Sequence, residues 1–172
     1  MTRGRILIGE LEHDLTHLRP FPITVTPKAQ DAPSYRVLVS FGHHTFTRAF
    51  DEDVDNPDHR YEEDGDVRCF CQDRYLASKG LPSLIRQGAA GRAYFSQTRN
   101  YMLIDQPLGG APYAVFFNIE RAKALKGIEV TMFVVSAYEK PGLPARSRLP
   151  AISFATLVSK TARGEAVKRP KK

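Results

Sequence analysis

The sequence predicts an α+β fold in which an antiparallel β-meander sheet carries two short helices packed on one face. Four consecutive segments between Arg92 and Lys140 are rich in β-branched and aromatic residues, which favour strands. Short connections separate them, and the second carries the Gly and Pro residues that end strands. Directly before the meander, residues 68–91 hold the clearest helical patterns in the chain.

The expected strands of the meander are 92–97, 100–106, 113–120 and 128–140. Side chains alternate between the two faces of a strand, so Arg92 and Tyr94 share one face and Ala93 and Phe95 the other. A meander of this kind has one covered face and one face free to hold a ligand.

The expected helices lie between an early strand and the meander. Residues 35–41 form a buried strand that ends at Gly42. Gly80 fits the end of a first helix, and Pro82 fits the first turn of a second that ends near Gly88.

A chain of 172 residues is long enough for one domain with a full core. We place this domain at 35–140, with an acidic insertion at 51–66. Residues 1–34 are expected to be an irregular N-terminal lead-in. Residues 141–172 read as a linker, a short apolar element and a basic tail.

The positive charge is concentrated at the C-terminus. The net charge is +6, and residues 160–172 hold six basic residues against one acid. The other residues, 19 basic and 18 acidic, are close to neutral. No apolar run approaches the roughly 18 residues of a membrane helix, and no signal peptide is apparent. We therefore expect a cytoplasmic protein without a membrane partner.

The cysteines and acids suggest neither a cofactor nor a metal. Cys69 and Cys71 stand one residue apart, which strains a disulfide, and a second cysteine pair for zinc is missing. The acidic insertion holds nine of the 19 acids and spaces some of them as in a calcium loop. Asn56 and Pro57 stand where that loop needs glycine and a tight turn. An exposed, mobile, metal-free loop is predicted.

The segment 43–48, HHTFTR, follows the buried strand and is the densest set of chemically useful side chains. If the strand continues, His43 and His44 point to opposite faces. An imidazole beside a guanidinium supplies a proton carrier near neutral pH and a fixed positive charge, as phosphodiester cleavage requires. The alternative is an edge strand whose polar side chains are solvated.

Arginine and tyrosine on an open sheet face form a platform for phosphates and stacked bases, and a basic tail adds affinity. The RNA-binding candidates are Thr45, Thr47, Arg48, Tyr94, Tyr101, Lys168, Arg169, Lys171 and Lys172.

The order of a strand, two helices and a meander with a polar-aromatic last strand resembles the RelE-type toxins. These belong to a wider group of small ribonucleases that includes barnase and the colicin and BrnT nucleases. The resemblance covers about residues 35–140 and concerns topology and residue type. It implies metal-independent RNA cleavage by side chains of the sheet face, and a protein antitoxin or regulatory partner. The catalytic candidates are His43, His44, Arg92, Arg99, Ser136, Tyr138 and Lys140.

In this scheme a histidine takes the proton of the ribose 2′-hydroxyl. Arg92 or Arg99 stabilises charge on the phosphate, and Tyr138 or Lys140 assists the leaving oxygen. The alternative is a non-catalytic toxin or regulatory module that binds a protein partner or nucleic acid through the same open face.

Overall fold

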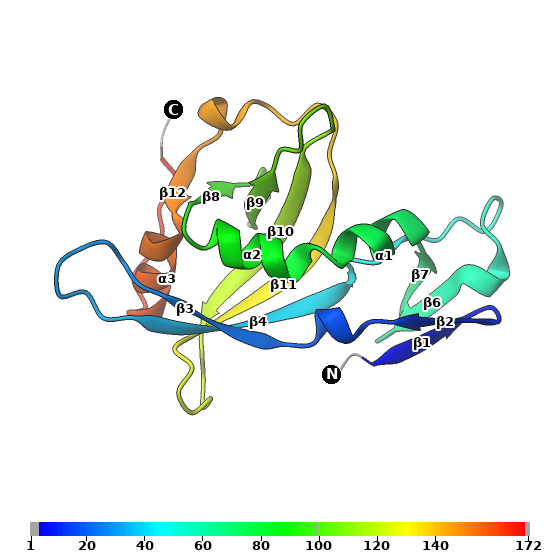
Figure 1. Cartoon of the computed structure of the whole chain (residues 1–172), viewed down its shortest axis with the longest axis horizontal. Helices are drawn as coiled ribbons and strands as arrows, with labels where there is room; N and C mark the ends of the chain where they lie inside the picture. Colours follow the sequence, from blue (N-terminus) through cyan, green and yellow to red (C-terminus); the bar gives the residue numbers. More distant parts are fainter. Residues whose placement is uncertain (1–3, 99, 171–172) are drawn as a thin grey trace.

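The computed structural model describes residues 4–98 and 100–170 (Figure 1). A seven-stranded sheet with the order β12-β8-β9-β10-β11-β4-β3 forms its centre. The elements are β1 (Arg5–Ile8), β2 (Leu11–Asp14), β3 (Phe21–Val25), β4 (Tyr35–His44), β5 (Thr47–Ala49), β6 (Arg60–Glu63), β7 (Asp66–Phe70), α1 (Gln72–Ser78), α2 (Leu81–Gly88), β8 (Arg92–Phe95), β9 (Tyr101–Asp105), β10 (Tyr113–Arg121), β11 (Val130–Glu139), β12 (Ala151–Ser153) and α3 (Phe154–Ala162). The short 3₁₀ helices are η1 (Thr16–Leu18), η2 (Pro57–His59) and η3 (Arg146–Arg148).

The predicted meander is present, but it is only part of the sheet. Strands β8, β9, β10 and β11 pair with their neighbours in antiparallel order, as expected. Strand β4 then pairs in parallel with β11, so the prediction of a purely antiparallel sheet is wrong. Parallel neighbours need a long crossover connection, and the chain from β5 to β10 provides one. The α+β class is therefore confirmed with a mixed sheet.

The N-terminal residues are more ordered than the predicted irregular lead-in. β1 and β2 form a hairpin with Gly9 at a positive φ of 58°. β3 forms the edge of the large sheet, where the missing N–H of Pro22 is tolerated. Leu15 and Leu18 lie in the core. Pro20 and Pro22 therefore lie at the start of an edge strand and do not mark an irregular segment.

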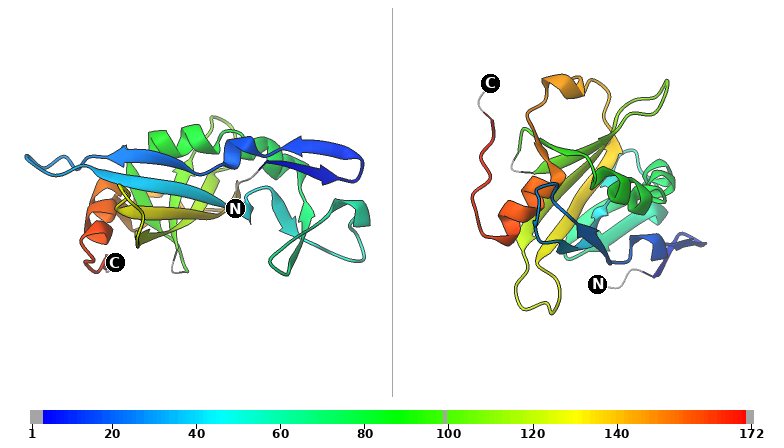
Figure 2. Two further views of the ribbon diagram at one scale, coloured as in Figure 1. Left: turned by 90° about the horizontal axis from the view of Figure 1, so that it is seen from below. Right: turned by 60° about the vertical axis from the view of Figure 1, so that its left-hand side comes forward.

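Both predicted helices are present, and a third accompanies them. α1 and α2 lie over one face of the sheet (Figures 1 and 2) and bury Tyr75, Leu81 and Ile85. α3, within the segment expected to be a short apolar element, buries Phe154 against Phe117 of β10, with ring centroids 6.0 Å apart. Among the described residues, none of the helices has the length and apolar character needed to cross a bilayer.

A second, three-stranded sheet with the order β5-β7-β6 lies beyond the end of β4 (Figure 1). It contains the second half of the predicted acidic insertion. The chain passes from the large sheet into this small one directly after His43 and His44, so the two histidines lie at the junction of the two sheets.

Candidate functional site

The HHTFTR segment does not continue as one strand. The N–H of Phe46 donates to the carbonyl of His43, and the chain turns from β4 into β5. The hydroxyl of Thr45 donates to the carbonyl of Gly42 at 2.7 Å, and that of Thr47 to the carbonyl of His43 at 2.8 Å. Both threonines are completely buried, so the prediction that they contact RNA is wrong. Their hydroxyls instead stabilise the turn.

The β6–β7 hairpin brings two carboxylates to this turn. Asp64 and Gly65 connect the strands with positive φ angles of 54° and 81°, which Asp-Gly adopts in two-residue hairpin turns. Glu63 and Asp66 pair directly across that turn. This half of the acidic insertion is thus an ordered hairpin and not the expected loop.

In the first half of the insertion, Asp55 organises the loop through its hydrogen bonds. The carboxylate of Asp55 accepts hydrogen bonds from both Arg48 Nη atoms and from the N–H of Asp51. These donors hold the pKa of Asp55 at about 2. Arg48, predicted to bind RNA, is therefore already paired with a carboxylate.

His43 and His44 converge on Asp66. Nε2 of His43 lies 2.9 Å and Nε2 of His44 lies 2.6 Å from the same oxygen, Oδ2 of Asp66. The two rings meet edge to face with centroids 4.7 Å apart. A regular strand would direct these neighbours to opposite faces. They converge because β4 ends in a turn here, where its register with β11 is also irregular.

The electrostatics fix the roles in these hydrogen bonds. Hydrogen bonds from His44 and His43 lower the pKa of Asp66 to about 2, so its carboxylate is ionised and can only accept. Glu63 Oε1 lies 3.9 Å from Nδ1 of His43, and its other oxygen accepts a hydrogen bond from the hydroxyl of Tyr61. We call His43, His44, Glu63 and Asp66 the histidine end of the sheet.

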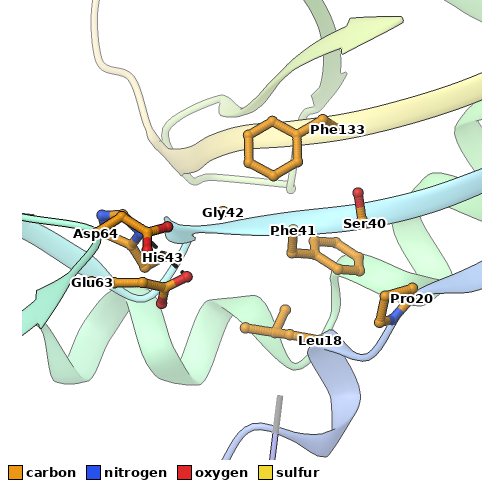
Figure 3. A pocket seen from close by; sticks show the side chains of 9 residues that line it. All are labelled: Leu18, Pro20, Ser40, Phe41, Gly42, His43, Glu63, Asp64 and Phe133. Atoms are coloured by element: carbon orange, nitrogen blue, oxygen red, sulfur yellow. Dashed lines mark ion pairs between the residues drawn. The ribbon is translucent and has the colours of Figure 1, made fainter. Parts of the chain in front are cut away.

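A pocket of about 330 Å³ opens beside His43. Figure 3 shows His43 and Glu63 at one end and Leu18 and Phe133 on its walls. A Cβ at Gly42 would lie 3.0 Å from Cζ of Phe133 and 3.2 Å from the carbonyl oxygen of Val135. A glycine at this position thus lets the strand end approach β11 closely.

A row of cationic and aromatic side chains lies next to the histidine end. The guanidinium of Arg74 lies 4.7 Å from the centroid of the Tyr138 ring, which stacks on Phe116. Nζ of Lys140 lies 5.8 Å from the Phe116 centroid. Arg74 also donates to the carbonyls of His44 and Thr47, which ties it to the end of β4. We call Arg74, Phe116, Tyr138 and Lys140 the basic-aromatic strip.

The comparisons with known proteins give one result. The model of the YjaZ family matches residues 5–162, which cover every strand and helix described above. The chain belongs to the YjaZ family. No curated protein and no solved structure matches it. The matched residues include the whole histidine end and the whole basic-aromatic strip, so this site lies within the part of the chain that the family model covers.

Five of the predicted catalytic residues lie near one another in this YjaZ-family chain. Ser136 is the register partner of His44, Tyr138 follows on the same strand, and Lys140 comes directly after the strand ends. The five are His43, His44, Ser136, Tyr138 and Lys140.

The other candidates lie elsewhere. Arg92 and Tyr94 are on β8, and three strands separate β8 from β4. Tyr101 packs between Phe95 and Phe117, where burial raises its pKa. In the tail, Lys168 is exposed, and Arg169 donates to the carbonyl of Ser96 at 2.9 Å. Arg99, Lys171 and Lys172 are outside the described residues.

Sequence reasoning missed Asp66, Glu63 and the contribution of Arg74. The Asp-Gly dipeptide at 64–65 is a strong hairpin signal and would have placed the two flanking acids together. In the sequence, Arg74 is recognisable only as a basic residue on a predicted helix. Such a residue equally well belongs to a solvent-exposed helix face. Its role depends on a strand end that lies 30 residues earlier in the chain.

Proposed function

We propose that this chain is a small endoribonuclease that cleaves RNA by acid–base catalysis at the histidine end. The observation that carries the proposal is that Nε2 of His43 and Nε2 of His44 both meet Asp66 Oδ2, beside the basic-aromatic strip. Two imidazoles provide a proton acceptor and a proton donor, as cleavage through a ribose 2′-hydroxyl requires.

His44 is the better placed general base. Its Nε2–H donates to Asp66, which leaves the lone pair of Nδ1 available, as in triads where a carboxylate fixes the tautomer. Its side chain is 33% exposed, about twice the 16% of His43, so a substrate reaches it more easily. In the proposed step, Nδ1 takes the 2′-hydroxyl proton as the 2′-oxygen attacks phosphorus.

His43 is the better placed general acid. It lies between two carboxylates, with Asp66 Oδ2 2.9 Å from Nε2 and Glu63 Oε1 3.9 Å from Nδ1. As the phosphorus–oxygen bond breaks, His43 gives its proton to the 5′-oxygen that leaves. The products are a 2′,3′-cyclic phosphate and a free 5′-hydroxyl, so protons balance between the two histidines.

The basic-aromatic strip supplies the binding surface. Arg74 and Lys140 carry the positive charge that attracts phosphates, and Tyr138 stacked on Phe116 offers a face for a base. Arg74, rather than Arg92 or Arg99, takes the role of the nearby guanidinium in this scheme.

The test is cleavage of a labelled single-stranded RNA by the purified chain in EDTA. We expect His44→Ala to lower kcat/KM by about 10²–10⁴. Asp66→Asn should lower it by about tenfold or more, because the amide no longer fixes the imidazole tautomer. His59→Ala is the matched control, since His59 is an exposed histidine outside the site. No cleavage by the wild type, or equal cleavage by His44→Ala, overturns the proposal.

One observation favours the alternative, a non-catalytic module that docks a protein partner. Phe133 is 44% exposed at the rim of the pocket beside His43. An exposed aromatic beside a pocket is a common anchor point in protein interfaces. Binding of RNA or of a partner protein without cleavage, weakened by Phe133→Ala, would favour this function.

A further inference from the structure

We propose that His43, His44 and Asp66 form a binding site for a zinc ion. One ligand atom from each residue lies within 4.8 Å of the others. Across residues 4–98 and 100–170, this is the group of three or more His, Cys, Asp or Glu side chains with such spacing. Zinc binds nitrogen and oxygen ligands at about 2.0–2.2 Å. The ligand atoms around one zinc ion therefore also lie within 4.8 Å of one another, as they do here.

The donor set selects the class of ion. Imidazole nitrogens with one carboxylate are typical ligands of zinc and neighbouring first-row divalent ions. Magnesium and calcium prefer oxygen ligands throughout and are disfavoured here. Three protein ligands leave a fourth position of the zinc tetrahedron for water. The pocket of about 330 Å³ is lined by His43 and Glu63, so a cavity adjoins one side of this group.

Glu63 and Tyr61 supply the outer support that zinc histidines usually have. A ligating histidine commonly directs its second nitrogen to a carboxylate, which fixes the ring and its tautomer. Nδ1 of His43 lies 3.9 Å from Glu63 Oε1, while Tyr61 holds the other oxygen of Glu63. This arrangement is independent of the His43–Asp66 and His44–Asp66 contacts.

The ligands are already gathered before an ion binds. The turn after β4 fixes both histidines, and the Asp64–Gly65 turn fixes Asp66. Zinc replaces the two N–H···O contacts, so each imidazole must carry its remaining proton on Nδ1 instead of Nε2. For His43 that proton then faces Glu63.

The experiment is calorimetric titration of zinc sulfate into the full chain after EDTA treatment and dialysis. We expect one zinc per chain. His44→Gln and Asp66→Asn should each weaken binding by more than about 100-fold, and Glu63→Gln by about 10–100-fold. His59→Ala should bind as the wild type does. Circular dichroism of the zinc-free variants verifies that they are folded.

A second measurement uses thermal unfolding with and without zinc. An ion that binds the folded chain raises Tm for the wild type and for His59→Ala, but not for His44→Gln. Absence of one-to-one binding, or equal binding by His44→Gln and Asp66→Asn, overturns the site. In the zinc-bound state Nδ1 of His44 carries a proton and cannot act as the proposed base, so zinc occupies the site in place of the cleavage step. Neither measurement contains RNA, so zinc binding and RNA cleavage are tested separately.

Discussion

The histidine end and strand β8, which lies between β12 and β9 of the large sheet, both contain residues that the sequence singles out for catalysis. At the histidine end, His43 and His44 of β4 are joined to Asp66 of β7 by hydrogen bonds. On β8, Arg92 is exposed and borders a pocket of about 220 Å³ together with Tyr94 and Arg146. The comparison teaches that a residue type suited to catalysis also needs a neighbouring group that fixes the orientation of its side chain.

The largest expected effect separates the two regions directly. His44→Ala should lower kcat/KM for RNA by about 10²–10⁴, because a general base is lost. Arg92→Ala should change kcat/KM by no more than about twofold, because a surface substitution away from the site changes the free energy by less than about 0.5 kcal/mol. Steady-state cleavage assays compare the two variants. A larger loss for Arg92→Ala would place the reactive centre at β8.

Gly42→Ala tests how the histidine end is shaped. The added Cβ would meet Phe133 and a carbonyl oxygen at 3.0 and 3.2 Å, so β4 must shift from β11. We expect a loss of about 1–3 kcal/mol in the free energy of unfolding. Gly80→Ala is the control, since its nearest neighbour lies at 3.5 Å and its φ is negative. Urea titration measures both, and equal losses would contradict the close approach at Gly42.

Removing residues 168–172 tests the basic tail. A deletion that began at Lys160 would cut into the fold, because residues 160–162 belong to α3 and Val167 packs against the core. The shorter deletion removes four cations, so RNA affinity should fall and its salt dependence should flatten by about 0.7 per lost phosphate contact. The cleavage rate at saturating RNA should not change. A fall in kcat with unchanged affinity would place the tail in the reactive centre.

The smallest expected effect concerns the Arg48–Asp55 pair in the region of the small sheet. Its hydrogen bonds lower the pKa of Asp55 from 3.8 to about 2. A folded-state pKa below the unfolded value stabilises the fold above the unfolded pKa, and this stabilisation is lost as pH falls from about 4 to 2. Asp55→Asn should therefore show a weaker acid dependence of Tm than the wild type. Identical pH profiles would argue against the pair.

The sequence by itself determined the elements whose signals are local. Three of the four meander strands lie within the predicted ranges, and β10 ends one residue later than predicted, at Arg121. Gly80 and Pro82 correctly marked the junction between α1 and α2. These predictions succeed because strand periodicity and helix boundaries depend on residues only a few positions apart. Local patterns also marked His43 and His44 as chemically useful side chains at the end of a buried strand.

Only the tertiary structure decided which distant segments meet. The parallel pairing of β4 with β11 joins Val37 to Val130, and no local pattern encodes such a contact. Likewise, Asp66 reaches the two histidines from 22 and 23 residues further along, through a hairpin whose orientation depends on the small sheet. The chemistry of the histidine end requires side chains from separate elements to lie within hydrogen-bonding distance of one another. Packing of the whole core fixes those distances, and periodicity along the chain does not.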